Sequence, residues 1–248
     1  MLMKKSLLGG VALLALLVSV SASYADPYYK PVREVAPRWA GFYAGIETGV
    51  GFGTKQFDFN DLTAAAPFRW DSSLTSNGFL AGGQLGYNWQ DGWLVIGVEA
   101  DAMWSSMNGH GLCNTTTFFM NCEAKTDAVG TVTARFGGAV GNALIYGKGG
   151  LAWAHDRYTI SNVALPPLAT AFSSSVTSTH MGWTMGMGVE YLIGGHWSAK
   201  IEYDYMDFGT DRTDFPVTNP AIAASNYRNW DLSQNIHVMK VGINYRFW

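Results

Sequence analysis

Apolar and polar residues alternate with a period of two along most of the chain after residue 38. Between residues 39 and 53, every second residue from Ala40 to Phe52 is apolar or threonine, whereas the positions between them hold glycine, Tyr43 and Glu47. A period of two predicts a β-strand with one apolar face. The alternation returns in residues 78–89, 94–104, 128–140, 144–154, 180–191, 197–205 and 239–247. The sequence therefore predicts eight strands, each with an apolar face and a face of glycine and charged residues.

The connections between these strands alternate between short and long. Short turns are predicted at Gln90-Asp91-Gly92, Gly141-Asn142 and Gly194-Gly195, and connections of about 20 residues or more near Asp61, Cys113, Pro166 and Pro220. Compact soluble domains rarely contain long connections without secondary structure. Short turns at one end and long loops at the other are typical of bacterial outer-membrane barrels, and an even strand number returns both chain ends to the periplasm.

The apolar phase carries the large aromatic side chains, and this decides which face points outward. These side chains include Trp89, Trp104, Trp183, Trp197, Tyr203 and Phe247. An eight-stranded barrel has an interior that side chains just fill, so it cannot hold them all. This argument excludes a soluble barrel of the lipocalin type, which places its apolar phase inside. We predict an all-β fold: an eight-stranded antiparallel up-and-down transmembrane β-barrel with short periplasmic turns and four long extracellular loops.

Composition agrees with strands rather than helices as the membrane-crossing elements. Mean hydropathy is near zero (+0.04) and only 14% of residues are charged, yet no stretch after the first 25 residues approaches the length of a transmembrane helix. Glycine (29 residues) and aromatics (14%) are both frequent. Small barrels use these residues for a crowded interior and for aromatic girdles at the two membrane surfaces.

The first 25 residues have the features of a secretory signal peptide. Lys4 and Lys5 precede an apolar run from Leu7 to Val20, and small residues at Ser23 and Ala25 predict cleavage after residue 25. A retained membrane anchor is the alternative, but a helix needs about 20 apolar residues to cross a bilayer and the run is shorter. We expect three parts: signal peptide 1–25, periplasmic segment 26–38 and outer-membrane barrel 39–248.

The predicted mature chain is mildly acidic. Removing residues 1–25 leaves 14 basic and 19 acidic residues, a formal charge of −5. No basic patch indicates a nucleic-acid partner.

Several motifs, in order along the chain, resemble one family. They are residues 39–45 (WAGFYAG), 97–101 (GVEAD), 146–152 (YGKGGLA), 182–191 (GWTMGMGVEY), 197–205 (WSAKIEYDY) and 241–247 (VGINYRF). Together they are similar to the opacity-type outer-membrane surface proteins, a porin-named family of small barrels. The resemblance implies the outer membrane of a Gram-negative bacterium, with outer-membrane lipid and lipopolysaccharide as partners. Members are credited with envelope integrity, adhesion and haem binding, so the family does not settle the function.

The C-terminus carries the expected assembly signal. Such barrels usually end on a lipid-facing aromatic residue that the barrel-assembly machinery is thought to recognise. Here Tyr245 and Phe247 are in phase, and Trp248 follows as an additional residue that departs from the pattern.

Eleven charged residues fall in the inward phase of the predicted strands. They are Glu47, Glu99, Asp101, Arg135, Lys148, Glu190, Lys200, Glu202, Asp204, Lys240 and Arg246. Nearly balanced charges in a narrow interior favour a network of ion pairs that holds the barrel shut. A conducting or proton-relay path is the alternative.

Only two cysteines occur, Cys113 and Cys122, within a polar stretch. In an exported protein they are expected to form one loop disulfide, because the periplasm and the cell surface are oxidising. The enclosed segment includes Phe118, Phe119 and Met120, which could contact an apolar ligand.

Four histidines, His110, His155, His180 and His237, are placed in loops or at strand ends on the outer side. His155 and His180 end neighbouring strands and are the candidates for binding haem, although they differ in strand phase. Solvated rim histidines are the simpler interpretation. No metal site and no cofactor is expected.

The one cluster with catalytic residue types is Ser178, His180 and Asp156, and it lacks a recognisable nucleophile motif. We therefore expect no enzyme activity. The predicted function is an outer-membrane surface barrel that contributes to envelope integrity and surface display. The alternatives are a loop-based receptor for haem or a host-cell component, and a small porin.

Overall fold

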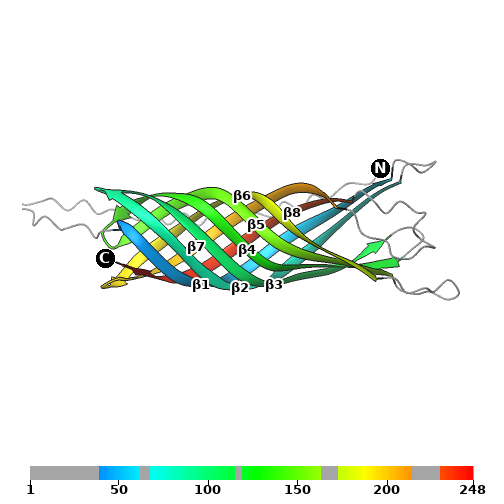
Figure 1. Cartoon of the computed structure of the whole chain (residues 1–248), viewed down its shortest axis with the longest axis horizontal. Helices are drawn as coiled ribbons and strands as arrows, with labels where there is room; N and C mark the ends of the chain where they lie inside the picture. Colours follow the sequence, from blue (N-terminus) through cyan, green and yellow to red (C-terminus); the bar gives the residue numbers. More distant parts are fainter. Residues whose placement is uncertain (1–38, 62–67, 115–118, 163–172, 214–229, 248) are drawn as a thin grey trace, which may run out of the picture. The chain divides into compact units, whose positions relative to one another are not determined.

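The computed structural model describes residues 39–61, 68–114, 119–162, 173–213 and 230–247. Its strands are β1 (Gly41–Asp61), β2 (Phe68–Asp91), β3 (Leu94–Asn114), β4 (Phe119–Val140), β5 (Ala143–Asn162), β6 (Ser173–Gly194), β7 (Trp197–Thr213) and β8 (Trp230–Arg246). Each strand pairs antiparallel with its chain neighbours, and β8 pairs with β1 to close the ring (Figure 1). The predicted eight-stranded up-and-down barrel is confirmed. Among these residues no helix is long and apolar enough to cross a membrane.

The predicted signal peptide and the segment 26–38 lie outside the described residues, as does Trp248. These assignments therefore stay predictions.

The three short turns lie where the sequence predicts them. Gly92, Gly141 and Gly195 have φ angles of 59°, 58° and 55°, a left-handed conformation that glycine adopts at little cost in tight hairpins. The pairing of Tyr43 with Arg246 places the start of β1 and the end of β8 at the same end of the barrel as these turns.

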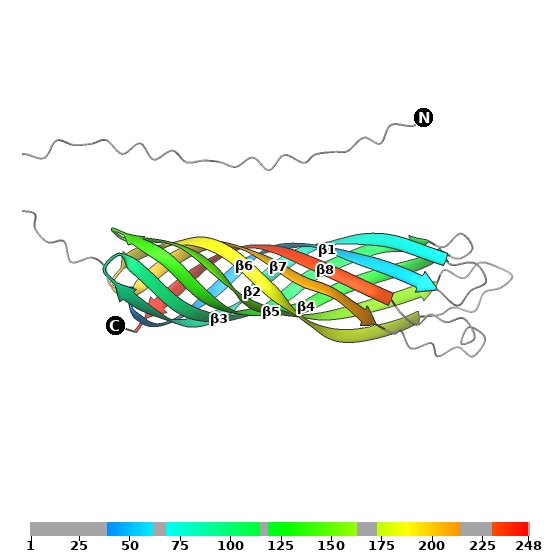
Figure 2. The same ribbon diagram turned by 90° about the horizontal axis from the view of Figure 1, so that it is seen from above.

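The strands are longer than predicted at the opposite end. β1 and β2 stay paired up to Asp61 and Phe68, and β3 and β4 up to Asn114 and Phe119. Figure 2 shows these paired strands running to the end of the barrel opposite the C-terminus. The prediction of long structureless connections near Asp61 and Cys113 is therefore wrong. The pattern of an apolar outward phase stops because outward positions such as Thr54 and Gln56 are polar there, whereas backbone pairing continues.

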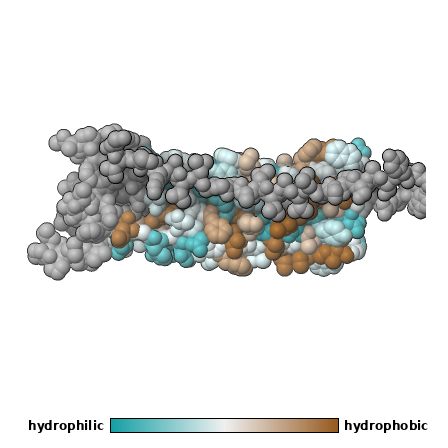
Figure 3. All heavy atoms as spheres, turned by 180° about the vertical axis from the view of Figure 1, so that it is seen from behind, coloured by the Kyte–Doolittle hydropathy of each residue, from teal (hydrophilic) through white to brown (hydrophobic). Residues whose placement is uncertain are grey.

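The outward face confirms the predicted phase. Side chains such as Ile46, Leu85 and Trp104 are 72%, 64% and 78% exposed, which a membrane protein tolerates because lipid covers them. In Figure 3 apolar residues gather toward the turn end of the barrel. The band ends outward at Phe52, Phe79, Trp104, Trp153, Met181 and Tyr205.

Beyond this apolar band most outward side chains are polar, with Leu112 on β3 as an exposed apolar exception. The polar side chains include Thr54 and Gln56 on β1, Ser106 and Asn108 on β3, Thr177 and Thr179 on β6, and Ser233 and Asn235 on β8. The barrel wall therefore continues from the membrane into the aqueous phase.

The interior is filled in layers. At the turn end lie Trp39, Val95, Leu144 and Tyr146. A charged layer follows, and an apolar layer lies beyond it, made of Leu80, Met103, Met107, Val129, Ala152, Ala154, Met206, Phe208, Ile236 and Val238. The sequence interpretation of the inward phase as glycine and charge missed this apolar layer.

Candidate functional site

The charged layer is the largest concentration of polar chemistry within the described residues. Its members are the acids Glu47, Glu99, Asp101, Glu190, Glu202 and Asp204 and the bases Arg135, Lys148, Lys200 and Lys240. All are buried, and they come from β1 and from β3 to β8. Alternation points each of them inward, because their outward neighbours are the apolar residues of the band.

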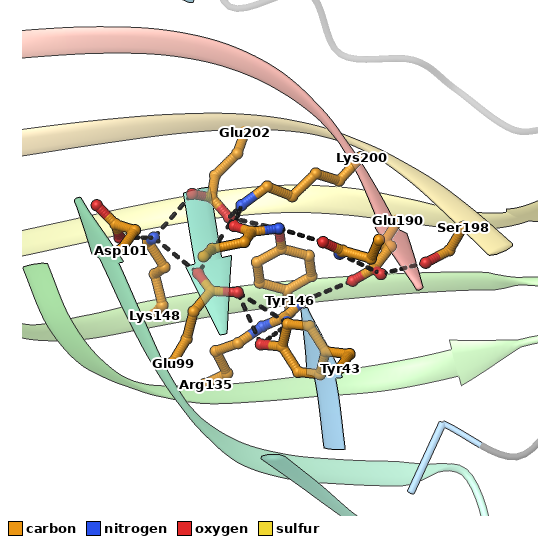
Figure 4. A network of polar contacts seen from close by, with 12 residues as sticks. Tyr43, Glu99, Asp101, Arg135, Tyr146, Lys148, Glu190, Ser198, Lys200 and Glu202 are labelled. Atoms are coloured by element: carbon orange, nitrogen blue, oxygen red, sulfur yellow. Dashed lines mark hydrogen bonds and ion pairs between the residues drawn. The ribbon is translucent and has the colours of Figure 1, made fainter. Parts of the chain in front are cut away.

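Lys148 lies at the centre of this layer. Its Nζ is 2.7 Å from Glu202 Oε1 and 3.1 Å from Glu99 Oε1. Asp204 and Asp101 follow at 3.4 and 3.6 Å. Figure 4 shows the ammonium surrounded by carboxylates from two opposite parts of the wall. One lysine thereby links β3, β5 and β7.

Lys240 and Lys200 extend the network to β1 and β8. Lys240 Nζ is 2.9 Å from Asp204 and 3.1 Å from Glu202. Lys200 Nζ is 3.0 Å from Glu47 and 3.3 Å from Glu202. Glu202 therefore contacts all three lysines, Lys148, Lys200 and Lys240.

Arg135 forms the part of the layer nearest the turn end. Its Nη1 donates to Glu99 at 3.2 Å and its Nη2 to Glu190 at 2.9 Å. The guanidinium also lies 3.9 Å from the centre of the Tyr146 ring, a distance suited to a cation–π contact. Ser198 donates to the second oxygen of Glu190. These contacts satisfy charges that would be costly to bury alone.

Arg246, predicted as part of the same network, interacts electrostatically with Glu190 of the charged layer. It is at the turn end, where its guanidinium is 5.5 Å from the Trp39 ring and donates to the carbonyl of Gly195. It therefore closes the periplasmic end of the lumen.

A second buried polar cluster, which the sequence interpretation missed, lies beyond the apolar layer. Lys55 Nζ is 2.5 Å from Asp156 Oδ1, and Thr126 donates to the same oxygen. The Lys55 ammonium is also 4.8 Å from the ring of Tyr158. Lys55 lies beyond the predicted end of its strand, so its inward direction was not considered. Lys55 follows Gly53 by two residues, and continuing the inward phase of the strand by this spacing would have predicted its inward direction.

The candidate haem ligands do not converge. His155 and His180 lie within β5 and β6 rather than at the ends of these strands, because both strands extend beyond their predicted bounds. His155 faces outward and contacts Thr179, whereas His180 is buried and its Nδ1 lies 2.6 Å from Asp211. Because the two imidazoles are on opposite faces of the wall, they cannot bind one iron together. In the described part of the chain, no three His, Cys, Asp or Glu residues form a group that could hold a metal.

The candidate catalytic residues are also directed at different partners. Asp156 and Ser178 are register partners on β5 and β6. Asp156 is engaged by Lys55, and His180 is engaged by Asp211. In a catalytic triad the acid and the nucleophile both hydrogen-bond to one histidine. The contacts of Asp156 with Lys55 and of His180 with Asp211 differ from that arrangement.

The predicted disulfide stays a prediction. Cys122 is buried on β4, and the backbone of Cys113 lies on the neighbouring strand β3 opposite Met120. The side chain of Cys113 lies outside the described residues, as do Phe118 and the side chains of Phe119 and Met120.

The assembly signal likewise stays a prediction. Tyr245 and Phe247 face outward and are 37% and 56% exposed, as a lipid-facing signal requires.

Comparisons with known proteins agree with this geometry. Residues 11–247 match the family model described as outer membrane protein beta-barrel domain. The 31 kDa outer-membrane immunogenic protein of Brucella melitensis is 32% identical over 249 residues, covering 96% of this chain and 98% of that protein. The 22 kDa outer membrane protein of Rhizobium leguminosarum is 29% identical, covering 88% and 82%.

Among solved structures, the outer membrane protein OprG from Pseudomonas aeruginosa superposes with a TM-score of 0.53 at 14% identity, covering 84% of this chain and 97% of that chain. This likeness supports the fold alone. The match to the family model over nearly the whole chain shows that the protein belongs to the outer membrane protein beta-barrel domain family and resides in the outer membrane of a Gram-negative bacterium.

Proposed function

We propose that this protein is a closed surface barrel that contributes to envelope integrity and displays its outer end to the surroundings of the cell. The observation that carries the proposal is the filled interior. A charged layer and an apolar layer lie one above the other across the lumen.

The charged layer supports a structural role because it cross-links the wall. Two ion pairs join strands that are not neighbours in the ring: Lys148 on β5 pairs with Glu202 on β7, and Lys240 on β8 pairs with Asp101 on β3. Removing one partner of a buried ion pair leaves an uncompensated charge. The network therefore ties the barrel into one cooperative unit and occupies the space that a pore would need.

The apolar layer supports closure on its own account. Leu80, Met107 and Ile236 are fully buried within it. Ions and small polar solutes would have to give up hydration to pass such a layer, which is costly.

The outer extension of the wall supports display. Strand ends such as Asp61 and Phe68 lie well beyond the apolar band, so the chain that connects them begins away from the lipid. The Brucella relatives are named immunogenic proteins, and surface exposure of this chain would agree with that property.

A deletion strain tests the proposal. Loss of the protein should increase sensitivity to detergents and to large antibiotics that an intact outer membrane excludes. Complementation with the wild-type gene or with an Ile201→Leu variant should restore resistance. Unchanged barrier function together with reduced uptake of small solutes would instead support a small porin, which the filled interior argues against.

Recognition of haem or a host-cell component by the outer loops is the second candidate. It rests on sequence outside the described residues and on rim histidines, of which His155 and His180 do not converge. Haem titration of the refolded protein and of its His155→Ala and His180→Ala variants tests it. If haem causes no spectral shift, or causes the same shift in the wild-type protein and in both variants, these histidines do not bind haem.

A further inference from the structure

A polar hollow lies on the outside of the wall where β1, β8 and β7 leave the apolar band. Six outward side chains form two rows across the three strands. One row is Thr54, Asn235 and Asp207, and the other is Gln56, Ser233 and Thr210. Register pairing fixes both rows, since Thr54 and Asp207 each lie opposite Asn235, and Gln56 and Thr210 each lie opposite Ser233.

A β-bulge in β7 shapes this hollow. The register shifts between Asp207 and Thr210, and Gly209 has a φ of 65°. The extra residue keeps Thr210 outward, level with Ser233, and places a glycine without a side chain between the two rows. Asp207 fixes the bulge by accepting a hydrogen bond from the Gly209 amide at 2.8 Å. The wall is therefore indented by a built local structure.

An aromatic row borders the hollow on its membrane side. Phe52 and Tyr205 each lie opposite His237, and the rings of Tyr205 and His237 are 5.0 Å apart. Tyr205 donates its hydroxyl hydrogen bond to Asp207 at 3.1 Å. The hollow thus combines aromatic faces at one edge with hydroxyl, amide and carboxylate groups.

This combination suits a sugar. Saccharide rings offer many hydroxyl groups that both donate and accept, which match serine, threonine, amide and carboxylate partners, and their C–H faces pack on aromatic rings. A phosphate would find no cation in the two rows. On β4 and β5, the outward cations Lys125 and Arg157 already face Asp127.

We propose that this hollow binds the core saccharide of lipopolysaccharide in the outer leaflet. The assignment to a glycolipid follows from position, because the aromatic row that borders the hollow is also the outer edge of the apolar band. Acyl chains that pack against the band bring their sugars to the height of the hollow. The barrel is thereby held in the leaflet by a specific contact in addition to its apolar surface, independently of any envelope role.

Binding to the refolded mature protein tests the proposal. The test variant combines Thr54→Val, Ser233→Ala and Asn235→Leu, which remove donors and acceptors but keep strand-compatible side chains. The matched control combines Thr177→Val, Ser175→Ala and Asn108→Leu, outward residues on β6 and β3 away from the hollow. The probes are lipopolysaccharide with its core sugars, lipid A without them, free core oligosaccharide, and phosphatidylglycerol vesicles.

We expect the test variant to lose at least tenfold in affinity for complete lipopolysaccharide, about 1.4 kcal/mol. Its affinity for lipid A and for phosphatidylglycerol should match wild type, and the control should match wild type with all probes. Heat-dependent gel migration verifies that each variant is folded. Equal affinity of both variants for complete lipopolysaccharide would overturn the site. Free oligosaccharide binding as tightly as the lipid-linked form would overturn the assignment to a glycolipid.

Discussion

The ammonium of Lys148 lies 2.7 Å from the carboxylate of Glu202, and neither side chain is reached by solvent. Replacing Glu202 with leucine should remove an acid that contacts Lys148, Lys200 and Lys240 together. Breaking a buried ion pair costs about 3 to 5 kcal/mol, so we expect a lower midpoint in urea unfolding and a lower folding yield. Ile201→Leu, one residue away and facing lipid, should be silent to within about 0.5 kcal/mol.

Arginine substitutions at the same two positions test which face is inside. Ile201→Arg places a guanidinium in hydrocarbon and should cost about 2 to 4 kcal/mol near the bilayer centre. Glu202→Arg should also destabilise, but the surrounding acids Glu47, Asp101 and Asp204 offer it partners. At each position, the unfolding midpoint of the arginine variant is compared with that of the leucine variant. We expect the arginine variant to be lower by a larger margin at Ile201 than at Glu202. An Ile201 position that accepts arginine as readily as leucine would mean that the barrel is inside out.

The outer ion pair gives a prediction that separates buried from exposed charge. Asp156→Asn keeps the size of the side chain but leaves the buried ammonium of Lys55 unpaired, and should cost about 3 to 5 kcal/mol. Lys55→Met with Asp156→Leu should recover most of the loss, because both charges are removed together. Asp127→Asn, at an exposed pair with Lys125, should cost at most about 1 kcal/mol. Unfolding in urea measures all three, and a double variant no better than Asp156→Asn would contradict the pairing.

Hydrophobic alternation predicted the strands wherever one face meets lipid. From Ala40 to Phe52 on β1, and from Met239 to Phe247 on β8, apolar residues must recur at every second position because hydrocarbon covers only one face. The same physics explains what was missed. Around Lys55 the outward positions Thr54 and Gln56 are polar, so the apolar outward phase ends there although hydrogen bonding continues.

Inward charges were recognised from the sequence because a charge cannot face lipid without a large cost. Their partners were not, since the contact of Lys148 with Glu202 joins β5 to β7 across the lumen. The apolar layer was not predicted from the sequence, for a different reason. Leu80 and Met103 occupy inward positions singly, and only closure of the ring brings such residues together.

Because the wall extends beyond the membrane, cysteines introduced at different positions of one strand should differ in their reactivity toward a water-soluble reagent. In a background with Cys113→Ser and Cys122→Ser, a cysteine at Asn108 on β3 should react with a membrane-impermeant maleimide on intact cells. A cysteine at Val98, on the same outward face within the apolar band, should not react until the membrane is dissolved. Equal labelling at both positions would contradict the placement of the band.

Closure of the lumen is the central claim, and conductance across a planar bilayer tests it most directly. The refolded mature protein is inserted at known density, and insertion is verified by heat-dependent gel migration of the same sample. A trimeric porin under the same conditions serves as the conducting control. Because the charged and apolar layers fill the interior, we predict no steady conductance above that of the bare bilayer. Steady, voltage-stable steps of porin size would show that the layers are not a plug and would contradict the account.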